Sequence, residues 1–194
     1  MTAAPGSGSG ECEKLEIEDD EPYGEGEADE EFDEADDLAV EVVAALVAAG
    51  QTVATAESLT GGLVCGALTD VPGASTVVRG GVVAYATDLK TDLLGVSAAL
   101  LTSAGPVHPV VASTMARAVR SRLGATFGVA TTGVAGPDPQ GAQPVGMVYV
   151  AVDGPDGSSV ERHQLTGDRA DIRAEAVSAA LRLLLAEATA RDER

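Results

Sequence analysis

The sequence predicts an α/β fold in which a mixed β-sheet carries helices on both faces. After residue 37, segments with helical spacing of apolar residues alternate with short Val- and Ala-rich strand segments, an order typical of parallel strands joined by helices. Two later strand segments are separated only by a turn sequence, which predicts an antiparallel hairpin in the same sheet. Aromatic residues make up only 3% of the chain, so the core must consist of Val, Leu and Ala.

The first segment of the chain is predicted to be a disordered acidic tail. Residues 1–37 hold sixteen Asp or Glu and one Lys, a net charge of −15, whereas residues 38–194 carry −4. So few apolar residues cannot offset the entropy of ordering the segment. The tail is either a plain solvated segment, a mimic of nucleic acid toward a basic partner, an entropic bristle, or a competitor for the domain's own basic site. Residues 38–194 are predicted to form one folded domain.

Charge and composition exclude several functional classes. A net charge of −19 disfavours binding to nucleic acid or to an anionic membrane, because such binding depends on Lys and Arg neutralising phosphates. No apolar run approaches the roughly 20 residues of a membrane span and no signal peptide opens the chain, so we expect a soluble, cytoplasmic protein. Cys12, Cys65, His108 and His163 are scattered, which predicts neither a disulfide framework nor a metal site.

The first half of the domain reads as alternating helices and strands. Residues 38–49 have helical spacing and stop at Gly50, which readily adopts the left-handed conformation of helix ends. Residues 52–56 are predicted to form a short buried strand. Residues 57–69 fit a helix with a glycine pair near its start, a sign of close backbone approach, and the loop 70–73 ends it.

The next elements are a strand and three helices. Residues 76–85 are rich in Val and predict a strand or strand pair, with a bend or bulge at a second glycine pair. Short helices are predicted over residues 88–94 and 97–103. A longer helix over residues 109–123 has Pro at its first position, where the missing N–H costs nothing.

The last third contains a strand, a hairpin and a long helix. Residues 125–132 form the predicted strand. Residues 146–152 and 159–165 flank the turn sequence 153–157 and predict the antiparallel hairpin. Residues 168–190 are amphipathic and predict the closing helix.

Lys90 is the most informative residue, because every other basic residue after Lys14 is one of ten arginines. A guanidinium stays protonated at any pH a protein meets, whereas an ammonium can lose its proton when burial or a nearby charge lowers its pKa. A neutral lysine beside a serine is the chemistry of a serine/lysine hydrolase. The alternative is one lysine left by chance in an Arg-biased sequence.

Three segments carry residues suited to chemistry. Ser58 stands where a predicted strand hands over to a helix, at backbone N–H groups that can hold an oxyanion or phosphate, although it could also be an ordinary helix N-cap. Tyr85 and Lys90 follow the next strand, and residues 132–138 form a glycine-containing loop after another, either an anion site or a tight connection. Strand ends at one sheet edge would bring these segments together.

These segments, in order, resemble a known family. The motifs are Ala56 to Gly62, Tyr85 with Lys90, Gly133-Val134-Ala135-Gly136-Pro137-Asp138, Pro144-Val145-Gly146 and Gly167-Asp168-Arg169. They are similar to the stand-alone nicotinamide-nucleotide amidohydrolase (PncC) family, equivalent to the C-terminal domain of CinA, over about residues 38–190.

The resemblance implies a three-layer α/β/α domain, often a homodimer, that hydrolyses the carboxamide of nicotinamide mononucleotide to nicotinic acid mononucleotide and ammonia. It implies Ser58 as nucleophile, Lys90 as its base and Tyr85 close by. As a third catalytic residue, Tyr85 could relay the proton or orient Lys90, and this route needs no cofactor or metal. Some positions differ from the usual family residues: Leu59 replaces a common cysteine, Ala86-Thr87 replaces Ser-Asn, His108 replaces a serine, and Pro139-Gln140 replaces a glycine pair.

Substrate-binding residues can be assigned from what the reaction needs. The N–H groups of residues Thr60, Gly61 and Gly62 are the expected oxyanion donors. The phosphate is expected to bind a helix N-terminus or the loop with Gly133 and Gly136, helped by Thr132 and by one arginine, although Arg169 and Arg173 could also be solvated charges on the last helix. The candidates for that arginine are Arg79, Arg169 and Arg173. The rival hypotheses are a catalytically silent domain of this type that binds a nucleotide or a protein, and an amidase for a different substrate.

Overall fold

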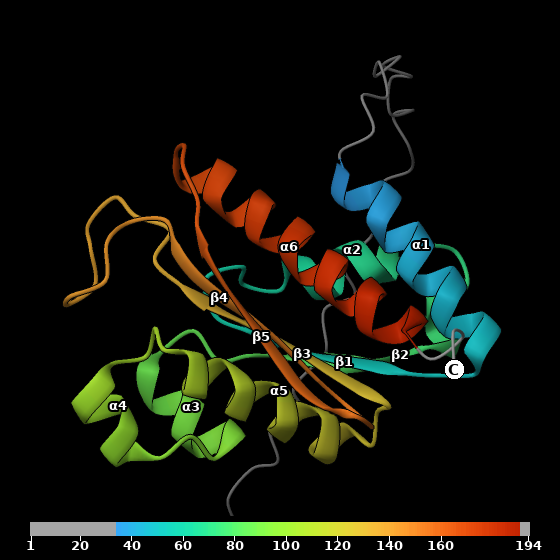
Figure 1. The fold of residues 1–194 in the computed structure, drawn as a ribbon, viewed down its shortest axis with the longest axis horizontal. Coiled ribbons are helices and arrows are strands. Elements are labelled where there is room, and N and C mark those ends of the chain that lie inside the picture. The colour runs from blue at the N-terminus through green and yellow to red at the C-terminus, as the bar shows by residue number, and fades with distance from the viewer. Residues whose placement is uncertain (1–33, 191–194) are drawn as a thin grey trace, which may run out of the picture. The chain divides into compact units, whose positions relative to one another are not determined.

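The computed structural model describes residues 34–190; residues 1–33, which include most of the predicted tail, and residues 191–194 lie outside that range. Helices and strands follow one another in the predicted order (Figure 1). The elements are α1 (Glu34–Ala49), β1 (Val53–Glu57), α2 (Leu63–Asp70), the short 3₁₀ helix η1 (Ala74–Thr76), β2 (Val78–Val83), α3 (Thr87–Leu94), α4 (Ala98–Ala104), α5 (Pro109–Leu123), β3 (Phe127–Gly133), β4 (Met147–Gly154), β5 (Gly157–Gln164) and α6 (Arg169–Thr189).

The strands form one mixed sheet in the order β2-β1-β3-β4-β5. β1 lies parallel to both β2 and β3, since helices connect these strands. β3–β4 and β4–β5 are antiparallel, and the β4–β5 hairpin closes at the pair Gly154–Gly157. The predicted mixed sheet and hairpin are therefore confirmed.

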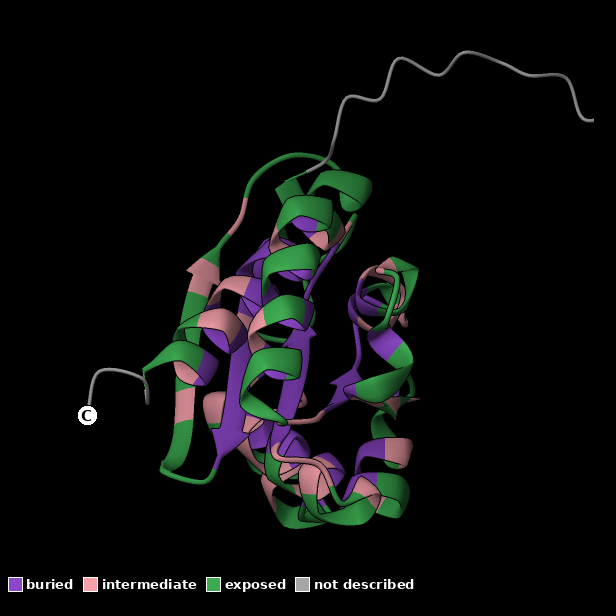
Figure 2. Ribbon diagram, turned by 90° about the vertical axis from the view of Figure 1, so that its right-hand side faces the viewer, coloured by how far each residue is buried: buried purple, intermediate pink, exposed green. Residues whose placement is uncertain are grey.

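Helices cover both faces of the sheet. α1, α2 and α6 lie on one face and α3, α4 and α5 on the other (Figure 1). Each interface has its own apolar core: Leu46 and Leu184 belong to the first, Met115 and Val119 to the second. In Figure 2 the central strands are buried while the helices turn exposed faces outward. These cores consist mainly of Val, Leu and Ala, as expected, with Phe127 as a buried aromatic residue.

Helix α1 begins four residues before its predicted start and so includes the last part of the predicted tail. Glu34 accepts a hydrogen bond of 2.6 Å from Arg182 of α6, and Ala35 is buried. Acidic residues in a first helical turn are stabilised by the helix dipole. The acidic composition that predicted disorder thus also suits a helix N-terminus.

Helix α2 begins at Leu63, not at the predicted residue 57. Gly61 and Gly62 have φ values of +66° and +106°, a left-handed conformation that cannot belong to a right-handed helix. Residues 58–62 therefore form a turn between β1 and α2, which we call the serine turn.

The predicted bulge in the strand after α2 is present. Val53 pairs with Val78 while Ala54 pairs with Gly80, which leaves one extra residue, Arg79, in β2. Gly81 lies so close to β1 that a Cβ atom there would be 2.5 Å from the Thr55 hydroxyl.

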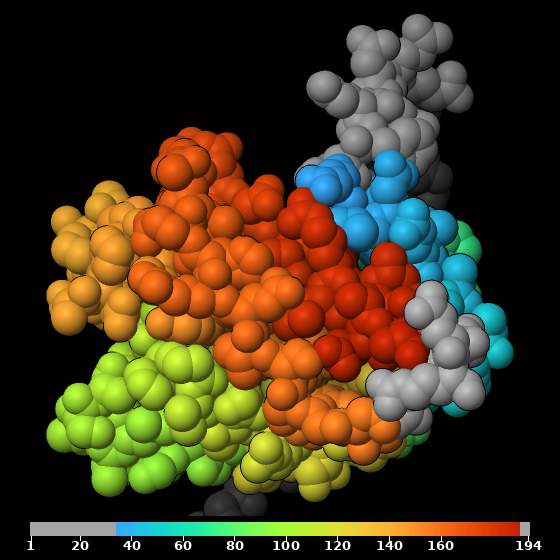
Figure 3. Space-filling model, in the orientation of Figure 1, coloured from blue at the N-terminus to red at the C-terminus, as the bar shows by residue number. Residues whose placement is uncertain are grey.

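The loop between β3 and β4 borders the helices of the second face. Figure 3 shows this loop in gold near α3 and α4 in green. Within residues 34–190, no helix is both long enough and apolar enough to cross a membrane.

Candidate active site

Three parallel strands end at the same edge of the sheet, and the predicted site residues follow them. Ser58 comes directly after β1, Tyr85 comes two residues after β2, and Gly133 ends β3. Ligand sites of open α/β sheets gather at such carboxyl ends.

Lys90 and Ser58 are in direct contact. Lys90 Nζ donates a hydrogen bond of 2.9 Å to Ser58 Oγ and a second of 2.7 Å to the carbonyl of Ala84. The side chains come from α3 and from the serine turn, and the residues are 1% and 8% exposed. Helix α3, which follows β2, thus places Lys90 at the end of the neighbouring strand β1.

Burial lowers the pKa of Lys90 from 10.5 to about 8. Removing an ammonium from water disfavours its charged form, and no described carboxylate pairs with this one to restore it. At pH 7 a pKa of about 8 leaves roughly one molecule in ten neutral, against about one in 3000 for an unperturbed lysine. Burial is the cause of this shift, and the guanidinium of Arg79 donates to the carbonyl of Leu123.

The carboxylate of Glu57 occupies the N-terminus of α2. It is 1% exposed and accepts hydrogen bonds from the N–H groups of Gly62, Val64 and Cys65, at 2.8 to 3.0 Å, and from two threonine hydroxyls. A buried carboxylate needs such donors, and a helix N-terminus supplies them. The N–H groups at this helix end are therefore already bound to Glu57 and cannot hold a substrate anion.

This arrangement commits two of the three predicted N–H donors elsewhere and buries the side chain of the third residue, Thr60. The Gly62 N–H goes to Glu57 and the Gly61 N–H goes to the carbonyl of Ser58. The Thr60 side chain is fully buried between Glu57 and Thr131, with hydroxyl contacts of 2.8 and 2.7 Å. Thr60, Gly61 and Gly62 shape the serine turn and do not line the cavity beside Ser58.

The N–H of Leu59 is the donor that lies next to Ser58 at the cavity. Within the described residues the N–H groups of Leu59 and Thr60 both have no acceptor, but only Leu59 borders the cavity that contains Ser58. In hydrolases whose nucleophile stands at a strand-to-helix turn, the N–H of the following residue serves as an oxyanion donor. Only the Leu59 main chain is needed for this, so its apolar side chain is compatible with the role.

A cavity of about 310 Å³ opens onto the Ser58–Lys90 pair. Its walls include Tyr85, Thr87, Thr132, Gly133, Gly136, Asp138, Pro139, Gln140 and Arg169. Tyr85, Thr132, Gly133, Gly136 and Arg169 were all predicted to belong to the site, and the structure brings them together. Arg79 does not line this cavity, so the prediction that placed it here is wrong.

Arg169 is the arginine of the cavity wall. Its guanidinium donates 2.8 Å to the carbonyl of Gly136 and 2.7 Å to the Tyr85 hydroxyl. Tyr85 therefore holds Arg169 and not Lys90, and the residue is 56% exposed. The Thr132 hydroxyl is also committed, since it donates 2.8 Å to the carbonyl of Pro106.

Two positions that differ from the usual family residues have clear structural roles. His108 caps α5, because its Nδ1 accepts 3.2 Å from the N–H of Val110, the bond a capping serine would accept. Leu59 packs into the first apolar core. By contrast, Thr87, Pro139 and Gln140 line the cavity, where they affect its shape.

Sequence reasoning missed Glu57 and misjudged Arg173. A carboxylate ending an otherwise apolar strand, followed within five residues by a glycine pair, was the available signal for Glu57. Arg173 was a candidate for phosphate binding, yet its guanidinium donates to the carbonyls of Leu59 and Thr60.

The chain is similar in sequence to known proteins. Residues 35–188 match the sequence model of the CinA C-terminal domain. A CinA-like protein from Frankia casuarinae is 52% identical over 149 residues, 77% of this chain and 34% of that protein. One from Mycolicibacterium gilvum is 47% identical over 155 residues, 79% of this chain and 36% of that protein. The chain thus spans about a third of the length of the curated relatives it matches.

Solved structures show the same fold. The competence/damage inducible protein CihA from Agrobacterium tumefaciens superposes with a TM-score of 0.76 at 39% identity, covering 79% of this chain and 94% of that one. A CinA superfamily protein from Klebsiella pneumoniae superposes with a TM-score of 0.78 at 29% identity, covering 80% of this chain and 98% of that one.

Proposed function

The chain belongs to the CinA C-terminal domain family, and from this premise we propose that it hydrolyses the carboxamide of nicotinamide mononucleotide. The products are nicotinic acid mononucleotide and ammonia. One observation carries the proposal: a buried lysine with a lowered pKa donates 2.9 Å to a serine hydroxyl at the wall of a cavity. Burial of a lysine without a partner of opposite charge costs free energy of folding and favours the neutral amine. Amide hydrolysis by a serine uses such a neutral amine beside the hydroxyl.

Ser58 is the proposed nucleophile and Lys90 its base. Ser58 Oγ attacks the amide carbon while neutral Lys90 Nζ takes the hydroxyl proton. The tetrahedral oxyanion would accept from the Leu59 N–H, a kind of contact that contributes about 2.7 to 4 kcal/mol to lowering the barrier. Lys90 then gives its proton to the departing nitrogen, so that ammonia leaves an acyl-serine. Water, deprotonated by Lys90, releases the acid and restores Ser58.

The substrate's phosphate is proposed to bind Arg169. A guanidinium has five N–H donors, and the contacts to Gly136 and Tyr85 leave others for an anion. Lys90 is excluded from this role, because its amine is buried at Ser58 and Ala84. A cavity of about 310 Å³ is at the small end of ligand pockets, which suits a mononucleotide.

The test is ammonia release from nicotinamide mononucleotide by the purified chain. We expect turnover by the unaltered protein and none above background for Ser58→Ala or Lys90→Arg, because the first lacks the nucleophile and the second keeps a permanently protonated base. Both variants should retain the thermal transition of the folded domain. Near-normal turnover by Lys90→Arg would rule out the base role, and normal ammonia release by Ser58→Ala would indicate direct attack by water.

The rival hypotheses predict different results in the same assay. A silent binding domain would bind the nucleotide without releasing ammonia. An amidase for another substrate would stay inactive here but would release ammonia from a different carboxamide in a Ser58-dependent reaction.

We also propose a cytoplasmic homodimer, following the family resemblance. Leu63 and Val83 are 44% and 45% exposed near the edge strand β2, and exposed apolar side chains of this kind favour association. Sedimentation of the purified chain at micromolar concentration tests the oligomeric state; a single monomeric species would contradict it.

A further inference from the structure

Glu57 and Arg173 both hydrogen-bond to the serine turn. The Glu57 carboxylate binds N–H groups at the end of the turn and in the first residues of α2. Arg173, on α6, binds two carbonyls of the same turn: Nε donates 3.0 Å to Leu59 and Nη2 donates 2.9 Å to Thr60. A negative group thus meets the donors of the turn and a positive group meets its acceptors.

Neither charge has another described partner of opposite sign. The ion pairs of the described residues include neither Glu57 nor Arg173. Glu57 is buried, and five neutral donors share its charge. An arginine that served only as surface charge would not place two of its nitrogens on consecutive carbonyls of a turn. Arg173 is therefore committed to the backbone of the serine turn, and Glu57 joins the end of the turn, through the Gly62 N–H and the Thr60 hydroxyl, to the first residues of α2.

The turn determines where Ser58 Oγ lies relative to Lys90. In a planar trans peptide the C=O and N–H point in opposite directions, so binding the Leu59 and Thr60 carbonyls fixes the orientation of two peptide planes, the one that joins Leu59 to Thr60 and the one that joins Thr60 to Gly61. Lys90 is held by the carbonyl of Ala84, and the Ala84 N–H in turn donates 2.8 Å to the main-chain carbonyl of Glu57. The 2.9 Å contact between Lys90 Nζ and Ser58 Oγ therefore depends on the position of the serine turn as well as on the position of the lysine.

We propose that Glu57 and Arg173 are positioning residues of the hydrolytic site, which act on Ser58 through the serine turn without touching the substrate. Helix α6 then contributes two arginines one turn apart with different tasks: Arg169 at the cavity and Arg173 behind the serine. This inference rests on the proposed nucleophilic role of Ser58 but not on the identity of the amide.

The experiment measures Ser58 reactivity separately from amide hydrolysis. A fluorophosphonate reagent forms a bond from an activated serine oxygen to phosphorus and expels fluoride, while the serine proton is taken up by the base. Intact-mass spectrometry follows labelling of the unaltered chain, of Arg173→Met, Arg173→Lys and Glu57→Gln, and of Ser58→Ala, which must remain unlabelled. Arg182→Met is the matched control, since Arg182 is on the same helix and pairs with Glu34 and Glu175.

We expect Arg173→Met and Glu57→Gln to label about a hundredfold more slowly than Arg182→Met, the loss typical of a reacting group displaced by about 1 Å. Arg173→Lys should lose less, because an ammonium can still donate to a carbonyl. In ammonia assays Arg173→Met should lower kcat and leave KM unchanged, whereas Arg169→Lys should raise KM. All measurements are made well below each variant's melting temperature, so a loss of stability alone would not slow labelling.

Three outcomes overturn the proposal: labelling of Arg173→Met at the control's rate, a raised KM with unaltered labelling, which would make Arg173 a substrate ligand, or no labelling of the unaltered chain. Ser58-dependent labelling without ammonia release from nicotinamide mononucleotide would contradict the proposed substrate. In that case the labelling rates of the Arg173 and Glu57 variants still decide the positioning role.

Discussion

At the scale of single residues, Lys90 is a buried lysine whose amine is a hydrogen-bond donor. It is 1% exposed, and its amine donates to one hydroxyl and one carbonyl. Both acceptors can be served by the neutral as well as the charged amine, so the protein tolerates loss of the proton. That tolerance is what a general base requires.

The pKa of Lys90 predicts how activity depends on pH. The reactive form is the neutral amine, so kcat/KM should rise as the pH increases and level off above about pH 8. The chain has lysines only at positions 14 and 90, so selective ¹⁵N-lysine labelling gives an NMR titration with few signals. The signal missing from Lys90→Arg should titrate near pH 8. A titration near the ordinary value of 10.5 would contradict the environment described here.

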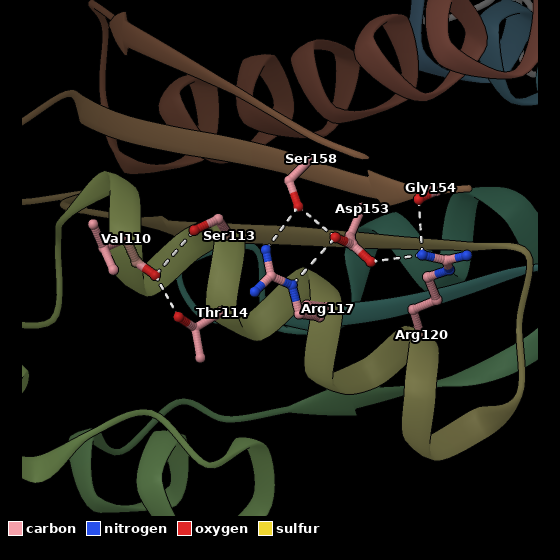
Figure 4. Close-up of polar contacts among 8 residues, drawn as sticks. All are labelled: Val110, Ser113, Thr114, Arg117, Arg120, Asp153, Gly154 and Ser158. Carbon is pink, nitrogen blue, oxygen red and sulfur yellow. Dashed lines mark hydrogen bonds and ion pairs between the residues drawn. The ribbon is translucent and has the colours of Figure 1, made fainter. Parts of the chain in front are cut away.

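At the scale of elements, a charged cluster fastens α5 to the β4–β5 hairpin. Figure 4 shows Asp153 between Ser158, Arg117 and Arg120, and Arg120 also donates 2.8 Å to the Gly154 carbonyl. Burial by itself raises the pKa of Asp153, but hydrogen bonds from Ser158 and Arg120 and the charges of Arg120 and Arg117 outweigh it and lower the pKa.

Asp153→Asn should lower the free energy of unfolding by about 2 kcal/mol at pH 7, the cost of losing hydrogen bonds to a charged group. Because the folded-state pKa lies below the unfolded value, this stabilisation is fully present above the unfolded pKa. It is lost as the pH falls through the folded pKa. In urea titrations, the free energies of unfolding of the unaltered chain and of Asp153→Asn should differ more at pH 7 than at pH 3. Asp92→Asn, at an exposed position of α3, is the control and should change little at either pH.

A second prediction concerns the contact between α5 and β3. A Cβ atom on Gly128 would lie 2.1 Å from the Ala116 carbonyl and 2.8 Å from the Arg120 Cβ, so the helix would have to move off the strand. Gly128→Ala should therefore cost about 1 to 3 kcal/mol of stability. Gly66→Ala makes the same chemical change in α2, with nothing within 4 Å, and should be neutral or stabilising by up to about 1 kcal/mol. Equal melting temperatures for the two variants would contradict the packing.

At the scale of the whole molecule, residues 34–190 contain the two apolar cores and the Ser58–Lys90 pair with its cavity. Two truncations that differ by four residues test where the folded domain begins. Removal of residues 1–33 should leave kcat/KM and the melting temperature unchanged. Removal of residues 1–37 should lower stability by about 1 kcal/mol, because it deletes buried Ala35 and the ion pair from Glu34 to Arg182. If the two truncations behaved alike, the first turn of α1 would contribute nothing.

Much of the fold could be predicted because it follows from local patterns. The bounds of α5 agree with the predicted residues 109–123, since Pro109 opens the helix and Gly124 closes it. The start of α2 could not be located this way: apolar spacing continues through residues 57–69, and only the left-handed Gly61 and Gly62 interrupt the helix.

The sequence by itself determined the order of the elements, the mixed sheet and the proximity of Ser58 and Lys90. Each follows from periodicity or from the rule that parallel strands end at one edge. Only the tertiary structure decided what each charge does: Arg79 binds a distant helix end, Arg169 the cavity wall and Arg173 the serine turn. The reason is physical. An arginine side chain is long, so its guanidinium can reach carbonyls of other elements. Its partner therefore depends on which carbonyls the folded chain leaves unpaired nearby.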